Sequence, residues 1–600
     1  MPATVILLGA LYGCAPVGSG SQQPSLSTSE FRAFLDADWA GYLADRPLFA
    51  SRVGVKDYQD RWNSVDEAFL DKERKRIETR LRQLEQFDRA GLNSKEQLSH
   101  DLYKLDLQRR LANDNFRHHL FVIHQHRGPH TSVPSNLINT HKITDLADAE
   151  AYVARLANVA GYFDAVIEQL EIRSEAGLLL ADWQYPKMIA AARNVISGVP
   201  FDGEQDSTLW ADFNKKVGAL SVSVAQREKL LTDARAALTD DLKPAYERLI
   251  AALEKQAVNA PDADGVWKFP NGDAFYAQRL RWYTTTELTA DEIHEIGLRE
   301  VDRIHGEMRT VMKEVAFVGE LEDFFAFMRE DPQFYYRNTD EGREAYLTDA
   351  RALIDEMYQA LPGVFGLLPK AEIVVKRVEP FRERSAGKAF YSSPPADGSR
   401  PGVYYANLYD MNSMPIYQMA ALAFHEGVPG HHMQRAISVE LDDIPQFQKY
   451  ASFTAYTEGW GLYSEALAGE MGFYRDPYSE FGRLAMELWR ACRLVVDTGI
   501  HSKRWTREEA IAYLIKNTPN SKADAVKAIE RYIAMPGQAT AYMIGKLKIV
   551  ELRERARAKL GEQFEVRDFH DAVLEDGPVP LSLLEAKIES MLTGTLGTSS

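Results

Sequence analysis

The stretch MAALAFHEGVPGHHMQ, residues 419–434, decides how the second half of the chain is built. Its first six residues are apolar, which indicates a buried helix that ends near His425. Pro429 and the glycine after it interrupt that helix, because proline lacks an N–H and clashes with the preceding turn. His431 and His432 follow at once. The pattern predicts two helix segments joined by a kinked turn, with imidazoles on both sides of the turn.

These residue types are the ligands and the base that a hydrolytic zinc site needs. Such a site takes three protein ligands and keeps one open position, and a nearby carboxylate accepts the proton of a water molecule. In the common HExxH helix the two His are four residues apart on one face. Here His425 and Glu426 supply the first half of that motif, but Pro429 stands where the second His would fall.

The second His ligand therefore has two candidates, His431 and His432. In an unbroken helix His432 would lie on nearly the same face as His425 but about 10.5 Å further along the axis. A widened turn at Pro429 would bring either ring back toward His425. His431 is favoured because it follows the irregular turn directly, and both stay open at this point. The competing interpretation is a solvated helix boundary with no metal.

The third ligand should come from a second helix packed against the first. The segment TEGWGLYSE, residues 457–465, places Glu458 among small and apolar residues. A carboxylate there is costly to bury unless it is paired or bound to a metal. Glu458 is therefore predicted as the third ligand. The alternative is that Glu458 is buried as the ion-pair partner of an Arg or Lys. Glu465 is the other carboxylate of this segment and is expected to be a surface or supporting group.

The rest of the chain is predicted to be mostly helical. Amphipathic periodicity predicts helices over residues 65–87, 146–176, 224–258 and 289–315, and a closing helix over 581–592. Thr289 and Glu292 form a capping box for the fourth of these. We expect two helical lobes, residues 30–260 and 261–600, that enclose a channel and do not fold independently, because no flexible linker separates them.

One region breaks the helical pattern. Residues 371–378 are β-branched, and residues 387–392 and 403–407 resemble two further strands around a loop rich in Pro, Gly and Ser. They predict a small antiparallel sheet next to the His-rich helix. Tyr404, Tyr405 and Asn407 are candidates for an edge that binds an extended peptide by backbone hydrogen bonds. A purely structural hairpin is the alternative.

The charge of the chain argues against one class of partner. The net charge of −17 argues against nucleic acid, because phosphate binding needs a basic face.

The N-terminus differs from the rest of the chain. Leu11-Tyr12-Gly13-Cys14 resembles a bacterial lipobox after a short apolar core, although no basic residue precedes that core. We interpret residues 1–29 as a signal peptide with a flexible tether. This predicts a periplasmic, lipid-anchored protein whose only contact with the membrane is through Cys14. The other thiol, Cys492, lies in an apolar helix and is expected in the core.

A set of motifs resembles one bacterial family. The set comprises residues 425–434, Glu458-Gly459-Trp460, Asp497 to His501, Arg531-Tyr532, Pro536 to Ala539, and Tyr542 with Gly545-Lys546. In this order they resemble bacterial proteins grouped under domain of unknown function 885, from about residue 31 to residue 592. That family is similar to helical metallopeptidases of the carboxypeptidase Taq, neurolysin and angiotensin-converting-enzyme kind. This chain departs from their HExxH motif by a two-residue expansion that contains Pro429.

The resemblance implies a specific site. It places zinc at His425, at His431 or His432, and at Glu458, with Glu426 as the general base. It also implies Tyr542 and His501 as donors to the oxyanion of a tetrahedral intermediate. Each donor has a plain alternative, Tyr542 as a core aromatic and His501 as a helix cap.

The function expected from the sequence is zinc-dependent hydrolysis of peptide bonds in short peptides, since a channel between lobes would exclude folded proteins. Two alternatives stay open. One is a peptide-binding lipoprotein without activity, and the other is a metal-dependent hydrolase of other amides or esters. The sequence does not predict the oligomeric state. A run of five histidines, residues 118–130, is interpreted as a loop at the channel mouth because no Cys or carboxylate accompanies it at ligand spacing.

Overall fold

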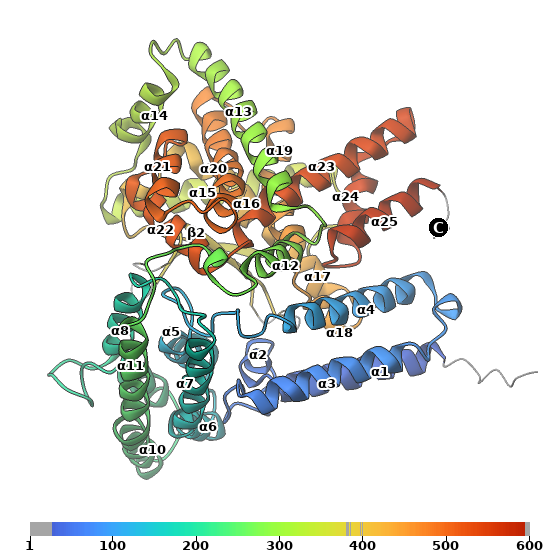
Figure 1. Ribbon diagram of the computed structural model, residues 1–600. Coiled ribbons are helices and arrows are strands. Elements are labelled where there is room, and N and C mark those ends of the chain that lie inside the picture. Colours follow the sequence, from blue (N-terminus) through green and yellow to red (C-terminus); the bar gives the residue numbers. More distant parts are fainter. Residues whose placement is uncertain (1–26, 380–382, 384–385, 396–397, 399, 594–600) are drawn as a thin grey trace, which may run out of the picture.

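The protein is mostly helical with one small sheet, as a computed structural model shows (Figure 1). The structure describes residues 27–379, 383, 386–395, 398 and 400–593. The lipobox prediction at Cys14 therefore lies outside the described residues. None of the described helices is long and apolar enough to cross a membrane.

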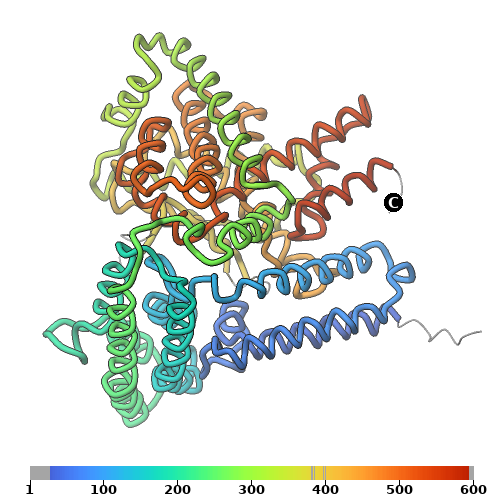
Figure 2. Tube along the Cα trace, in the orientation of Figure 1, coloured from blue at the N-terminus to red at the C-terminus, as the bar shows by residue number. Residues whose placement is uncertain are grey.

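The first part of the chain consists of helices only. They are α1 Thr28–Ala44, α2 Pro47–Arg52, α3 Glu67–Leu84, α4 Ser94–Asp114, α5 Pro129–Ser135, α6 Leu146–Ala157, α7 Val159–Glu175, α8 Gln184–Val195, α9 Thr208–Gly218, α10 Val224–Ala236 and α11 Lys243–Ala257. Figure 2 shows the chain leaving these helices after α11 and entering the second part, drawn above them, through α12.

The second part contains the sheet and the remaining helices. The strands are β1 Ile373–Arg377, β2 Ala389–Ser392 and β3 Gly402–Ala406. The helices are α12 Gly272–Thr284, α13 Ala290–Glu314, α14 Leu321–Glu330, α15 Asp340–Ala360, α16 Met419–Glu426, α17 His431–Glu440, α18 Gln446–Lys449, α19 Thr454–Glu470, α20 Pro477–His501, α21 Arg507–Asn517, α22 Lys522–Ala534, α23 Ala541–Leu560, α24 Val566–Leu574 and α25 Leu581–Thr593.

The predicted helices appear with two changes. Helix α13 starts after Thr289, and the Thr289–Glu292 capping box is present. The segment predicted as one helix over 146–176 breaks at Asn158, which ends α6 and precedes α7. The segment over 224–258 continues from α10 to α11 through a π-helical turn at residues 237–242. Periodicity alone does not show such local changes. The helical segments before and after each change keep their apolar face on the same core.

The sheet differs from the antiparallel one that the sequence predicted. Its order is β1-β3-β2: β2 and β3 form the expected antiparallel hairpin, but β1 pairs parallel with β3. The reason is the order of the strands, because β3 lies between β1 and β2 and pairs with both. Tyr404 and Tyr405 therefore lie on the central strand, so the predicted peptide-binding edge at these residues is wrong. The edges belong to β1 and β2.

Two tight helix pairs position the site. Helix α13 packs along α20, where Gly297 contacts the backbone and side chains of residues 494–495. Helix α19 packs along α23, where a Cβ on Gly459 would lie 2.5 Å from the backbone of Gly545. Cys492 is fully buried in α20, and burial raises the pKa of its thiol, as expected of a core residue.

Candidate metal centre

The turn between α16 and α17 brings His431 back toward His425. Helix α16 is buried along its whole length and ends at Glu426. The Val428–Pro429 peptide bond is cis, and α17 begins directly after Gly430. Only glycine fits there, because a Cβ would lie 2.1 Å from the carbonyl oxygen of His425. The two imidazoles consequently face each other, with ring centroids 4.6 Å apart.

Helix α19 supplies the carboxylate that completes the cluster. The Oε2 atom of Glu458 lies 3.6 Å from Nε2 of His425 and 3.5 Å from Nε2 of His431. Close helix packing makes this approach available, because a Cβ on Gly461 would lie 2.7 Å from Cε1 of His425. The indole of Trp460 also donates to the carbonyl oxygen of Pro429 at 2.8 Å and ties α19 to the turn.

The spacing within the cluster fits a metal ion better than hydrogen bonds. One ligand atom from each of His425, His431 and Glu458 lies within 4.8 Å of the others, the one such group among the residues the structure describes. The imidazole–carboxylate distances of 3.5 and 3.6 Å exceed ordinary hydrogen-bond lengths. Ligand atoms about 2.0–2.1 Å from a tetrahedral zinc lie about 3.3 Å apart, close to these values. The donor set of two His and one Glu is that of zinc hydrolases.

A second carboxylate holds His425 from behind. Oε1 of Glu465 accepts a hydrogen bond from Nδ1 of His425 at 2.8 Å, which leaves Nε2 directed at Glu458. Metal-binding His residues usually have such a partner, because it sets the tautomer and raises the basicity of the ring. Glu465 is almost fully buried, and the guanidinium of Arg490 lies 3.6 Å from it.

The charges of the cluster depend on one another. Burial alone would lower the pKa of His425, but Glu458 and Glu465 outweigh it and raise that pKa to about 9. Burial likewise opposes ionisation of Glu458, yet the two neighbouring imidazoles hold its pKa well below the usual range. Without an ion, the cluster therefore keeps a charged carboxylate between imidazoles, an arrangement in which a divalent cation can replace the proton.

Glu426 lies beside the cluster and not within it. The side chain is buried, and its neighbouring charges are His431, His425, Glu458 and Arg490. Burial raises the pKa of Glu426, while the two His residues lower it to a smaller extent. A carboxyl group with a raised pKa next to a metal site suits the exchange of protons with water at neutral pH.

Tyr542 stands at the start of α23 with its ring half-buried. The Arg493 guanidinium lies 4.3 Å from the centre of that ring. Arg531 is the other cation beside the Tyr542 phenol. The role of Tyr542 as an oxyanion donor stays a prediction.

His432 and His501, two other predicted residues, are committed elsewhere. Nε2 of His432 donates to the carbonyl oxygen of Ala371 at 2.9 Å, and the hydroxyl of Tyr391 lies 2.9 Å from Nδ1. The ring is fully buried, and burial lowers its pKa to about 4. The structure therefore separates the two candidates for the second ligand: His431 joins the cluster, and His432 fastens α17 to the sheet.

His501 is also enclosed by backbone. Its Nδ1 accepts the Val266 N–H at 3.3 Å, and its Nε2 donates to the carbonyl oxygen of Tyr532 at 3.0 Å. The side chain has no exposed surface, and burial lowers its pKa to about 4. With both ring nitrogens occupied, His501 has no free donor for an oxyanion. The prediction of a catalytic role is therefore corrected to a structural one.

Sequence reasoning missed the arginines near the site. Arg490 and Arg493 lie in the apolar core of α20, and both are nearly fully buried. Nε of Arg490 and Nη1 of Arg493 have no hydrogen-bond partner among the described residues. The available signal was two cations inside an otherwise apolar helix, a costly placement that indicates a functional or paired charge. The histidines of residues 118–130 lie apart from the cluster, and His118 pairs with Glu67.

The fold and site define a helical protein with a two-His, one-Glu cluster between buried helices. The chain belongs to the family described as bacterial protein of unknown function (DUF885), whose profile matches residues 47–588. A solved structure of a candidate lipoprotein from Colwellia psychrerythraea is similar, with 30% identity, a TM-score of 0.89, and coverage of 94% of this chain and 99% of that chain.

A second structure has the same fold. It is a candidate lipoprotein of unknown function from Shewanella oneidensis, with 19% identity, a TM-score of 0.70, and coverage of 93% of this chain and 99% of that chain. No curated protein matches the chain.

Proposed function

We propose that this protein is a zinc-dependent hydrolase that cleaves peptide bonds in short peptides. The observation that carries the proposal is the set of three ligand atoms from His425, His431 and Glu458 at the spacing of a tetrahedral metal site. The glycine next to His425 supports it, because any larger residue at position 461 would push the ring out of place.

The residues of the chain then have distinct roles. A bound zinc ion supplies Lewis acidity, which makes water nucleophilic near neutral pH. Glu426 accepts a proton from the attacking water and passes it to the leaving amine. Tyr542 donates a hydrogen bond to the oxygen that becomes negatively charged. Glu465 keeps the Nε2 side of His425 available for the metal.

The location proposed for the protein is the bacterial cell envelope, with Cys14 as the lipid-modified residue. The candidate lipoprotein from Colwellia psychrerythraea supports this proposal, because it is 30% identical and the match covers 94% of this chain. Peptides within the envelope are the substrates that such a location makes accessible.

Metal content and turnover test the function together. The full chain is purified, its zinc is measured by mass spectrometry, and cleavage of a mixed library of short peptides is followed. We expect about one zinc per chain in the natural protein. Glu426→Gln should keep the zinc and lose about 10²–10⁴-fold in turnover, the usual contribution of a general base. Glu458→Gln should lose the zinc itself.

The two variants control for each other, because each removes one carboxyl charge from the same site. A natural protein that takes up no zinc from excess, or that loses no turnover on Glu426→Gln, would contradict the proposal.

A further inference from the structure

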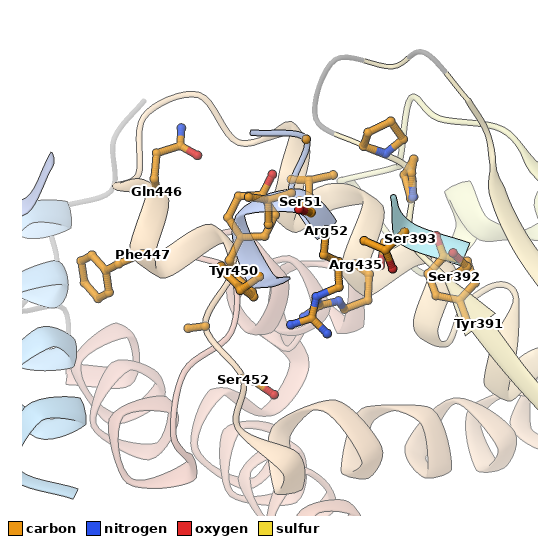
Figure 3. A pocket seen from close by; sticks show the side chains of 18 of the residues that line it. Ser51, Arg52, Tyr391, Ser392, Ser393, Arg435, Gln446, Phe447, Tyr450 and Ser452 are labelled. Atoms are coloured by element: carbon orange, nitrogen blue, oxygen red, sulfur yellow. The ribbon is translucent and has the colours of Figure 1, made fainter. Parts of the chain in front are cut away.

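A large cavity lies between the N-terminal helices and the sheet. Its volume is about 1420 Å³, and its walls come from α1, α2, α4, α17, α18 and the strands β2 and β3 (Figure 3). The edge strand β2 contributes Phe390, Tyr391 and Ser392. Tyr391 also contacts His432, the neighbour of the metal-ligand candidate His431. The cavity is therefore adjacent to α17, the helix that supplies His431 to the candidate metal centre.

The cavity has a charge opposite to that of the whole protein. The chain has a net charge of −17, yet seven basic and only three acidic residues line the cavity among those described. Asp38 pairs with Arg80, Asp106 pairs with Arg110, and Glu379 also has an interaction partner. Five of the cations have no ion pair in the described part of the chain, namely Arg52, Lys142, Lys376, Arg400 and Arg435. Such an excess of positive charge selects an anionic ligand.

Arg52 and Arg435 form the centre of this positive charge. Their side chains come from α2 and α17 and point toward each other in the cavity (Figure 3). Among the described residues, the groups with the largest electrostatic effect on Arg435 are the phenol of Tyr391, the guanidinium of Arg52 and the phenols of Tyr456 and Tyr450, and none of these four is a carboxylate. Burial, and to a smaller extent the charge of Arg52, lowers the pKa of Arg435. Two neighbouring guanidinium groups repel each other, and an anion bound between them would offset that repulsion.

The position of Arg435 relates this pair to the candidate metal centre. Arg435 follows His431 by four residues on α17, so both lie on one face of the helix about 6 Å apart along its axis. An extended peptide advances about 3.3 Å per residue. A carboxylate at Arg435 would therefore belong to a residue close to the bond that is cleaved.

We infer that Arg52 and Arg435 bind a carboxylate of the peptide substrate, which makes the protein selective for peptides with a negative charge near the cleaved bond. This inference rests on the proposed peptide hydrolysis. The carboxylate comes either from the C-terminus of the peptide or from an acidic side chain. Arginine suits both, because its planar guanidinium donates two parallel hydrogen bonds to a carboxylate.

Binding to a protein that does not turn over tests the inference without relying on catalysis. The full-length Glu426→Gln protein is loaded with zinc, and fluorescence anisotropy measures its affinity for dansyl-labelled peptides. The first pair of probes is Ala-Ala-Ala-Ala with a free carboxylate and the same peptide as an amide. The second pair is the amides of Ala-Ala-Ala-Glu and Ala-Ala-Ala-Gln. The pairs distinguish a terminal carboxylate from a side-chain carboxylate.

We expect the carboxylate member of one pair to bind about tenfold more tightly, as one charge-assisted interaction provides. Arg435→Gln and Arg52→Gln should each remove that preference. Arg435→Lys keeps the positive charge and should retain part of the preference. Arg299→Gln, which removes an exposed arginine of α13, is the matched control and should leave it unchanged. Thermal melting curves identify a variant that fails to fold, in which case Arg52→Gln, at the exposed last residue of α2, decides.

The outcomes separate this inference from the proposed function. Suppose that the natural protein hydrolyses peptides, but the Glu426→Gln protein binds the carboxylate and the neutral probe of each pair equally well. That result would overturn the anion site alone. A preference that depends on Arg435, in a chain that hydrolyses no peptide, would support the anion site and contradict the hydrolase.

Discussion

At the scale of single residues, the site depends on how each imidazole divides its two nitrogens. His425 directs Nδ1 to Glu465 and Nε2 to Glu458, whereas both nitrogens of His432 contact groups at the sheet. Two His residues of the same short motif thus have different roles. The difference arises from the groups around each ring and not from the ring itself.

Glu465 is expected to contribute to metal affinity through His425. We predict that Glu465→Gln weakens zinc binding about tenfold or more, because supporting partners of metal-bound His residues typically contribute 10–100-fold. Competition with a chromogenic chelator measures the affinity. Glu470→Gln, on the same helix and paired with Arg553 at the surface, is the control and should bind zinc as the natural protein does. Unchanged affinity in Glu465→Gln would show that the hydrogen bond to His425 does not support the metal.

At the scale of elements, glycines set the distances between helices. Gly459 lets α19 approach α23, and Gly461 lets the same helix approach the ring of His425. Gly430 fits the turn against the carbonyl of His425. Helices with larger residues at these positions would separate by the thickness of a side chain and open the cluster.

Gly461→Ala is predicted to displace His425. The added Cβ would lie 2.7–2.9 Å from three atoms of the imidazole, so the ring or the helix must move. We expect weaker zinc binding and a loss of about 1–3 kcal/mol in the free energy of unfolding, as in other overpacked cores. Calorimetric titration with zinc and denaturant unfolding measure the two effects.

The same helix offers a control for that substitution. Gly469→Ala places its Cβ at 3.5 Å from Tyr474, an ordinary contact distance, and should leave zinc affinity unchanged. Equal zinc affinity in the two alanine variants would mean that the His425 ring tolerates the extra methyl group.

At the scale of the whole molecule, buried polar groups join distant parts of the chain. Oδ1 of Asp497 in α20 accepts hydrogen bonds from the Tyr276 hydroxyl of α12 at 2.6 Å and from the Gly537 N–H at 2.9 Å. Burial raises the pKa of Asp497 to about 7, although these two donors lower it in part. The fold therefore keeps this carboxyl protonated at a pH where the unfolded chain ionises it.

The stability that the Asp497 carboxyl contributes should then fall as the pH rises. Since the unfolded pKa is about 3.9, the folded state binds one more proton than the unfolded state between about pH 4 and pH 7. The stabilisation from protonated Asp497 is fully present below pH 4 and is lost as the pH rises through 7. Asp497→Asn removes this dependence. Its melting temperature relative to the natural protein should be higher at pH 8 than at pH 5, measured by circular dichroism.

An exposed aspartate controls for a general effect of charge. Asp302→Asn on α13 removes an exposed carboxylate and should change the melting temperature equally at both pH values. If the melting temperatures of Asp497→Asn and the natural protein differ by the same amount at pH 5 and at pH 8, then Asp497 is ionised in the folded protein.

The sequence by itself determined the helical class, the core position of Cys492, the Thr289 cap and the cluster candidates His425 and Glu458. Each of these follows from local information: apolar periodicity, a capping pattern, or a charged residue in an apolar stretch. Family membership could also be recognised from motif order, and the profile match confirms it.

Only the tertiary structure decided which His joins His425, what His501 does, and which strands form the edges of the sheet. His431 and His432 are neighbours in sequence, and only the turn at Gly430 and the position of β2 separate their environments. The basic cavity also has no signal in the sequence, because its cations come from segments that are up to hundreds of residues apart. Ligand geometry depends on contacts between segments distant in the chain, and periodicity within one segment does not encode them.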